Sequence, residues 1–283
     1  MNALKTAMLL ALLSALLLVG GQALAGRQGL YIAFALTAVM NLASYFLSDK
    51  IALMSYSAQP VTETENPEVY RRVAPIVRGL AHRMNIPMPK LWILPEESPN
   101  AFATGRNPNH ASVAFTAGIL QIMNDNELEG VIAHELGHVL HRDILISSVA
   151  AMLASAITML ASMARWAMIF GGSSRDDDDR GNPIAAIAMM ILAPLAAGLI
   201  QMAISRSREY DADSASVKYV GSPYPLVTAL QKLDAYSKRI PMDASPSTAH
   251  LFIMKPHTES WLMTLFSTHP STADRIARLQ SMR

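Results

Sequence analysis

Four long runs of uncharged, mostly apolar residues constrain the fold of this chain more than any other feature. Each run has about the 20 residues that a helix needs to cross the hydrocarbon core of a bilayer. One such run could be a buried helix of a soluble protein, but four of them, in a chain that is 51% hydrophobic and 16% charged, favour membrane spans. The predicted spans are residues 7–25, 30–47, 144–164 and 184–204.

The first run has a second interpretation. Lys5, the leucine-rich run and the Ala-Leu-Ala of residues 23–25 resemble a signal peptide with its cleavage site. The run is long for a signal core, however, and the second run starts only a few residues later. We therefore favour an uncleaved helical hairpin that turns at the Gly-Arg-Gln-Gly of residues 26–29.

The charges that flank the spans predict their orientation. Lys50 and further basic residues follow the second span, and Arg206 follows the fourth, whereas the loop of residues 171–183 is acidic. The positive-inside rule then places both termini and both large polar regions in the cytoplasm. The predicted organisation is a transmembrane hairpin (1–50), a cytoplasmic region (51–143), a second pair of spans (144–204) with the acidic external loop 171–183, and a cytoplasmic helical region (205–283).

The first cytoplasmic region has the pattern of a small α+β domain. Asn66, followed by Pro67, is typical of a helix start, and strands are predicted at "KLWILP", "NAFATG" and "ASVAFT". Asn124 with Glu127 three residues later forms a capping-box pattern, which begins another helix. The predicted fold class is a mainly α membrane protein with four transmembrane helices and a cytoplasmic α+β domain with a small sheet.

That second helix carries an HExxH motif, "HELGH". Because His134 and His138 are four residues apart, both imidazoles lie on one helix face and can reach one ion. Glu135 points beside the ion, where it can take a proton from water. The chain has no cysteine, so a transition metal must be held by His, Asp or Glu. A net charge of +1 without a basic, aromatic-rich patch argues against nucleic acid binding.

A catalytic zinc ion needs a third protein ligand. In "SRSREYDADS", Glu209 and Asp213 lie four residues apart on one helix face. Glu209 could bind the metal, and Asp213 could accept the outer N–H of a ligand histidine. These residues could also form an ordinary charged helix start, but an HExxH motif upstream favours Glu209 as the ligand.

The stretches "HELGH", "SRSREYDAD", "TAHLFIMKP" and "LFSTHPSTADRIARL" together resemble the HtpX family, bacterial heat-shock membrane zinc metalloproteases of the gluzincin type. The resemblance covers nearly the whole chain. It implies a gluzincin-like metalloprotease domain in which His134, His138 and Glu209 bind the metal and Glu135 is the base. It also implies that His269 helps to bind substrate or to stabilise the oxyanion, although His269 could equally be a residue at a helix start.

The resemblance implies a zinc-dependent integral membrane endopeptidase of the bacterial inner membrane, with one Zn²⁺ per chain. The expected substrates are misfolded or damaged membrane proteins and exposed cytoplasmic segments. A substrate backbone could add as a strand to the edge formed by Asn100, Ala101, Phe102, Ala103 and Thr104, although this stretch could also be a structural hairpin. The alternatives are a processing peptidase for one membrane-associated substrate and a non-catalytic zinc-binding membrane chaperone; Glu135 favours catalysis. The sequence does not indicate an oligomeric state.

Overall fold

The computed structural model describes residues 26–39, 53–143, 206–237 and 270–282, together with isolated positions such as Ile253. The chain divides into two compact units. One unit consists of Met1–Tyr45 and Ile146–Ala203, and the other of Phe46–Leu145 and Ile204–Arg283.

In the first unit, residues 26–39 form a helix. Residues 26–29, where the sequence predicts the turn of a hairpin, are themselves helical, and Gly26 has a φ of 55°. A Cβ at Gly21 would lie 2.5 Å from the Cβ of Ala33 and 2.6 Å from the carbonyl oxygen of Gly29, so these residues approach one another closely. The hairpin stays a prediction. Within the described part of the chain, no helix is both long enough and apolar enough to cross a membrane. All four predicted spans extend into residues outside that part, and they stay predictions.

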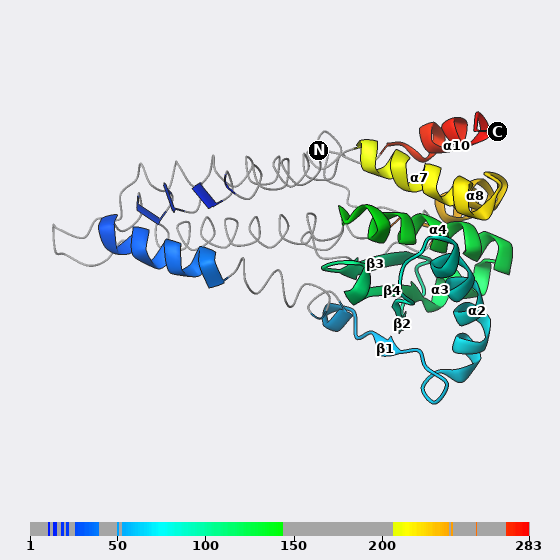
Figure 1. Ribbon diagram of the computed structural model, residues 1–283, viewed down its shortest axis with the longest axis horizontal. Coiled ribbons are helices and arrows are strands. Elements are labelled where there is room, and N and C mark those ends of the chain that lie inside the picture. The colour runs from blue at the N-terminus through cyan, green and yellow to red at the C-terminus, as the bar shows by residue number, and fades with distance from the viewer. Residues whose placement is uncertain are drawn as a thin grey trace. The chain divides into compact units, whose positions relative to one another are not determined.

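The second unit contains the polar regions of the chain (Figure 1). Its described elements are β1 (Gln59–Pro60), α2 (Pro67–Arg83), β2 (Lys90–Leu94), β3 (Ala101–Gly105), the 3-10 helix η1 (Pro108–His110), β4 (Ala111–Thr116), α3 (Ala117–Ile122), α4 (Asp125–His141), α7 (Arg206–Val220), α8 (Tyr224–Ser237) and α10 (Thr272–Gln280). The three predicted strands correspond to β2, β3 and β4, so the predicted small sheet with surrounding helices is confirmed.

The sheet is mixed, with the strand order β1-β2-β4-β3 among the described residues. β2 pairs with β4 in parallel, and β3 pairs with β4 in antiparallel register, with Ala103 opposite Val113. At the end of β3, Gly105 has a φ of 133°, and a Cβ there would collide with the carbonyl oxygen of His110. Glycine is therefore needed where the chain turns from β3 towards β4. This topology leaves β3 at one edge of the sheet.

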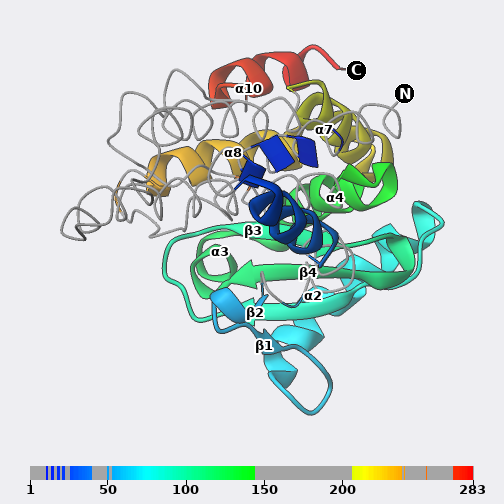
Figure 2. The same cartoon turned by 90° about the vertical axis from the view of Figure 1, so that its left-hand side faces the viewer.

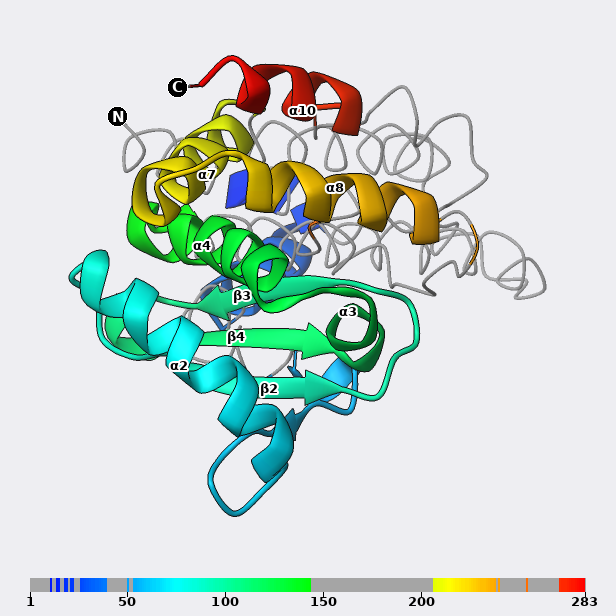
Figure 3. The same ribbon diagram turned by 90° about the vertical axis from the view of Figure 1, so that its right-hand side faces the viewer.

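The helix α4 lies between β3 and the helices α7, α8 and α10 (Figure 3). Figure 3 shows α4 beside β3, α7 and α8 on the opposite side of α4, and α10 beyond them; Figure 2 gives the same order from the other end. Most of α4 is buried, and Leu128, Val131, Ile132 and Leu136 are fully enclosed in the core. The motif on α4 is thus held in a rigid part of the unit.

The sequence predicts helix starts at Asn124 and at Asn66, and the structure places these residues at the N-caps of α4 and α2. The Asn124 side chain accepts a hydrogen bond from the Glu127 N–H, and the Glu127 carboxylate accepts one from the Asn124 N–H, so the predicted capping box is confirmed. Asn66 stands at the N-cap of α2, but its side chain makes no capping bond. With a φ of 56°, Asn66 instead donates from Nδ2 to the carbonyl oxygen of Pro60, at 2.8 Å.

Candidate active site

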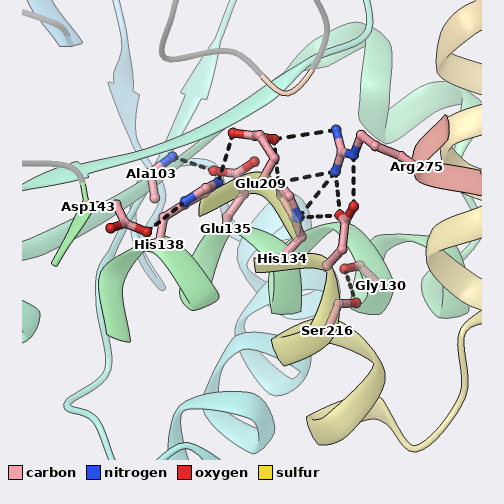
Figure 4. A network of polar contacts seen from close by, with 10 residues as sticks. Ala103, Gly130, His134, Glu135, His138, Asp143, Glu209, Ser216 and Arg275 are labelled. Carbon is pink, nitrogen blue, oxygen red and sulfur yellow. Dashed lines mark hydrogen bonds and ion pairs between the residues drawn. The ribbon is translucent and has the colours of Figure 1, made fainter. Parts of the chain in front are cut away.

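The two motif histidines of α4 meet a glutamate of α7. One ring nitrogen of His134, one of His138 and a carboxylate oxygen of Glu209 all lie within 4.8 Å of one another (Figure 4). The Nε2 atoms of His134 and His138 are each 3.6 Å from an oxygen of Glu209, one from Oε2 and the other from Oε1. Among the described residues these are the three that could hold a metal ion.

Two glycines of α4 allow this approach. A Cβ at Gly137, inside the motif, would lie 3.1 Å from both the Cα of Ala212 and the Cβ of Ala215 in α7. A Cβ at Gly130 would lie 2.6 Å from the backbone nitrogen of Leu226 in α8. The lack of side chains at these positions lets α7 and α8 pack closely on α4, and this packing carries Glu209 to the histidines.

An aspartate and an arginine support His134 from behind. The Nδ1 of His134 donates to Oδ1 of Asp213 at 2.9 Å, which leaves Nε2 unprotonated, with its lone pair available to a metal; Nη2 of Arg275 lies 3.3 Å from this Nε2. Arg275, from α10, donates to both oxygens of Asp213, from Nε at 3.0 Å and from Nη2 at 2.6 Å. Its Nη1 lies 3.6 Å from Oε2 of Glu209. All four side chains are buried.

Burial and the nearby charges shift the pKa values of this group. Burial and the Arg275 charge lower the pKa of His134 to about 4, so the ring is neutral at pH 7. For Asp213, burial alone would raise the pKa, but Arg275 and the hydrogen bond from His134 outweigh it and lower the pKa. A neutral imidazole is the form that binds a metal.

A similar but looser arrangement stands behind His138. Its Nδ1 lies 3.5 Å from Oδ2 of Asp143, and Nε of Arg208 lies 3.7 Å from Oδ1 of Asp143. The His138 side chain is 16% exposed, compared with 1% for His134. Burial lowers the pKa of His138, but Asp143, Glu209 and Glu135 outweigh this and raise it to about 9.

Glu135 is held by the edge strand. Its Oε2 accepts a hydrogen bond of 2.9 Å from the backbone N–H of Ala103, and the residue is 2% exposed. Burial raises the pKa of Glu135 to about 8; the opposing charge of His138 is the next largest influence, and Glu209 raises the pKa further. The carboxyl group is therefore poised to hold or release a proton near neutral pH.

The structure brings together most of the residues singled out in the sequence. His134, Glu135, His138, Glu209 and Asp213 form one contiguous cluster, and Ala103 reaches it through its N–H. His269 lies outside the described residues.

The backbone groups of the other candidate substrate-strand residues point alternately towards β4 and away from it. The carbonyl of Asn100 accepts the N–H of Thr116 from the β4 side. Backbone groups alternate along a strand. The N–H and C=O groups of Phe102 and Thr104 therefore also point to β4, and those of Ala101 and Ala103 point away from it.

Sequence reasoning missed Asp143, Arg208 and Arg275. Arg275 is 3% exposed and lies on the same face of α10 as the buried Leu279, four residues later. A charged residue on the apolar face of an amphipathic helix is a sign of a buried ion pair. That pattern in "ADRIARLQ" could have identified Arg275, but not its partner.

Comparisons with known proteins agree with this geometry. Residues 67–283 match peptidase family M48. Relatives named "Protease HtpX homolog" from Desulforapulum autotrophicum and Desulfatibacillum aliphaticivorans are 53% and 51% identical, over 99% and 100% of this chain and 89% and 90% of theirs. The crystal structure of S. mikatae Ste24p shares the fold, with a TM-score of 0.52 at 20% identity; the match covers 88% of this chain and 57% of that one.

The helix-borne HExxH motif, the mixed sheet and these matches identify a metalloprotease. The chain belongs to peptidase family M48. The resemblance to the HtpX family that the motifs indicated is confirmed by the relatives, which match over nearly the full length.

Proposed function

We propose that this metalloprotease is a zinc-dependent endopeptidase of the bacterial inner membrane that cleaves misfolded or damaged membrane proteins and exposed cytoplasmic segments. In it, His134, His138 and Glu209 hold one Zn²⁺ per chain, Asp213 orients His134, and Glu135 is the general base. The observation that carries the proposal is the convergence of three ligand atoms within 4.8 Å of one another, directly beside Glu135.

The donor set fits zinc. Zinc binds imidazole nitrogen and carboxylate oxygen at about 2.0–2.2 Å in a tetrahedron, so neighbouring ligand atoms stand roughly 3.4 Å apart. The two nitrogen-to-oxygen separations of 3.6 Å are close to that value. The hydrogen bond between Nδ1 of His134 and Asp213 fixes the tautomer that presents Nε2 to the ion. Three protein ligands leave one coordination position for water or substrate.

The chain's own residues then have distinct roles. Zinc supplies the Lewis acidity that polarises the scissile carbonyl and makes a water molecule easier to deprotonate. Glu135 takes the proton of the attacking water and later delivers it to the leaving amine. The Ala103 N–H holds one oxygen of Glu135 in place, so the carboxylate does not need to reorient during the proton transfers.

His269 is proposed to bind substrate or to stabilise the oxyanion. Replacing it with alanine should lower kcat more than it raises KM if it acts mainly on the transition state. An unchanged kcat/KM in the H269A variant would remove this role.

The substrate is proposed to pair with β3. Ala101 and Ala103 direct their backbone groups away from β4, and main-chain pairing tolerates many side chains, as a broad protease requires. Two of these groups already have partners: the carbonyl of Ala101 accepts the N–H of Ile253 at 3.3 Å, and the N–H of Ala103 binds Glu135. A substrate strand that reaches Ala101 would therefore exchange with the Ile253 contact.

The membrane location is proposed from the apolar runs and the flanking charges, with both termini and the active site in the cytoplasm. The chain contains no cysteine, so single cysteines can report its topology without a background. In intact spheroplasts, a membrane-impermeant maleimide should label Ser173→Cys, in the acidic loop, and should leave Glu63→Cys unlabelled until lysis. Labelling of Glu63→Cys in intact spheroplasts would reverse the topology.

The decisive test of the catalytic role is Glu135→Gln in the detergent-purified protein. Cleavage of an unfolded casein-like protein should vanish while bound zinc stays near one per chain, because the base is lost and the ligands are kept. Glu129→Gln is the matched control, since Glu129 is on the same helix but pairs with Arg83; it should retain activity. Loss of zinc in E135Q together with retained hydrolysis would refute the assigned roles.

The same experiment decides between the alternatives. A non-catalytic zinc-binding chaperone would bind zinc and prevent aggregation of a substrate without cleaving it, in both the wild type and E135Q. A dedicated processing peptidase would leave casein intact but cleave one membrane-associated protein. Glu135, whose pKa is raised to about 8, can exchange a proton near neutral pH beside the ligand cluster, and this favours the broad peptidase over the chaperone.

A further inference from the structure

We propose that Arg275 is a positioning residue of the metal site, so that the C-terminal helix α10 must be docked before the site is complete. Arg275 does not touch the reacting atoms in this role. It acts on His134 through Asp213 and through its own Nη2, which lies 3.2 Å from Nδ1 and 3.3 Å from Nε2 of the ring, and it acts directly on Glu209. The inference rests on the proposed metal-binding function.

The guanidinium group connects two carboxylates that have different tasks. Its two parallel bonds to Asp213, at 3.0 Å and 2.6 Å, fix the carboxylate that holds His134. Its remaining amino group lies 3.6 Å from Oε2 of Glu209, the proposed third ligand. One side chain therefore constrains two of the three ligands, from a helix that carries none of them (Figure 4).

The orientation of α10 shows that this contact is built into the fold. Arg275 is 3% exposed, and Leu279, one turn later on the same face, is fully buried. Arg278, three residues after Arg275, is exposed and lies over the ring of Tyr210 at 4.5 Å. The helix packs on α7 and α8, so its docking places Arg275 behind the ligands (Figure 3).

Arg275 could affect a metal ion in two opposite ways. As a cation it repels another cation, so its removal would tighten metal binding. As the partner of Asp213 it holds His134 in the orientation for binding, so its removal would weaken metal binding. Because the charge of Arg275 is balanced by the adjacent Asp213, the two charges nearly cancel at the ion, and we infer that orientation dominates.

The experiment separates these effects by comparing a single variant that removes the Arg275 charge with a double variant that keeps the net charge, both in the full chain in detergent. Zn²⁺ affinity is measured by competition with a chromophoric chelator, and ligand geometry by the visible absorption of the Co²⁺-loaded protein. Arg275→Gln should weaken Zn²⁺ binding by about 10- to 100-fold and shift the Co²⁺ bands. The double variant R275Q/D213N, which leaves the net charge unchanged, should weaken binding as well. Arg278→Gln, on the same helix, should match the wild type.

A purely electrostatic role predicts the opposite pattern: tighter binding in R275Q and wild-type affinity in the double variant. A merely structural role predicts a lower melting temperature of the metal-free protein with unchanged Zn²⁺ affinity and unchanged Co²⁺ bands. Either pattern overturns the proposal. If R275Q does not fold, Arg275→Lys decides, because lysine keeps the charge but cannot make two parallel bonds; it should still weaken binding.

Failure of the proposed function gives a different result. If the wild type itself binds no Zn²⁺ stoichiometrically, the metal site is wrong and Arg275 has nothing to position. If the wild type binds one Zn²⁺ and R275Q binds it equally well, the metal site stands and only the role of Arg275 falls.

Discussion

Each of the two histidines of α4 is held by an aspartate and an arginine, but the contacts are shorter at His134 than at His138. Behind each ring stands an aspartate, and behind each aspartate an arginine. On the His134 side the bonds to Asp213 measure 2.6–3.0 Å and every member is buried. On the His138 side the separations at Asp143 are 3.5 Å and 3.7 Å, and the ring is 16% exposed.

The difference follows from where the supports come from. Asp213 and Arg275 belong to helices packed in the core of the unit, and a low local dielectric strengthens their interaction. Asp143 and Arg208 are also buried, but Asp143 follows the end of α4 and Arg208 lies in the first turn of α7. We expect His134 to be the fixed half of the metal site and His138 the adjustable half.

The largest effect should come from Asp213→Asn. This change removes the closer of the two carboxylates beside the buried Arg275 cation and leaves only Glu209, at 3.6 Å, which costs up to about 3–5 kcal/mol of unfolding free energy. It also removes the acceptor that fixes His134, so Zn²⁺ affinity should fall by about 100-fold, the upper end for residues that hold a ligand. Chelator competition and thermal unfolding measure the two losses. Asp211→Asn, exposed on the same helix, is the control.

Asp143→Asn should have the smaller effect of the two aspartates. Because its contact with His138 is longer, at 3.5 Å, and the ring is less buried, we expect a loss of Zn²⁺ affinity of about 10-fold. The same chelator assay, applied to D143N and D213N in parallel, gives the ratio of the two losses of Zn²⁺ affinity. Equal losses in D143N and D213N would show that the two halves of the site do not differ in strength.

The sequence predicted the parts of the site that are set by local geometry. The spacing of His134, His138 and Glu135 on one helix follows from 3.6 residues per turn, and so does the four-residue step from Glu209 to Asp213. The strands of the sheet and the capping box of α4 were equally local, and the structure confirms them. Glu209 is favoured as a ligand because an HExxH helix requires a third one.

The supports were not predictable in this way, because they join segments that are distant in the chain. Arg275 meets Asp213 across 62 residues, and only the packing of α10 on α7 and α8 brings them together. The register of β2 with β4, which leaves β3 at the sheet edge, is likewise a tertiary outcome.

The two histidines should also respond to pH in opposite directions in the metal-free protein. The pKa of His138 is raised to about 9, so its contribution to stability is complete below pH 6.5 and is lost as pH rises towards 9. The pKa of His134 is lowered to about 4, so its contribution is present above pH 6.5 and is lost as pH falls towards 4. Glu135, with a pKa of about 8, adds to the alkaline loss up to that pH.

Alkaline unfolding of the metal-free protein therefore reports on His138 and Glu135 up to about pH 8, and on His138 above that pH. In the presence of a chelator, the unfolding free energy should fall between about pH 6.5 and 9, by about 1.4 kcal/mol per pH unit for each proton involved. Replacing Asp143 with asparagine removes a cause of the raised pKa, so the decline should become shallower. An identical slope in the wild type and D143N would mean that Asp143 does not act on His138.

The smallest effect should follow from Arg208→Gln. The 3.7 Å between Nε of Arg208 and Oδ1 of Asp143 is too long for a hydrogen bond, so Arg208 contributes mainly as a charge. We expect less than a tenfold loss of Zn²⁺ affinity, most of it restored by Arg208→Lys, which keeps the charge. Lysine should not restore binding in the same way at position 275, where two parallel bonds are made. Chelator competition on both lysine variants measures this contrast directly, and full rescue at both positions would mean that charge alone supports the two histidines.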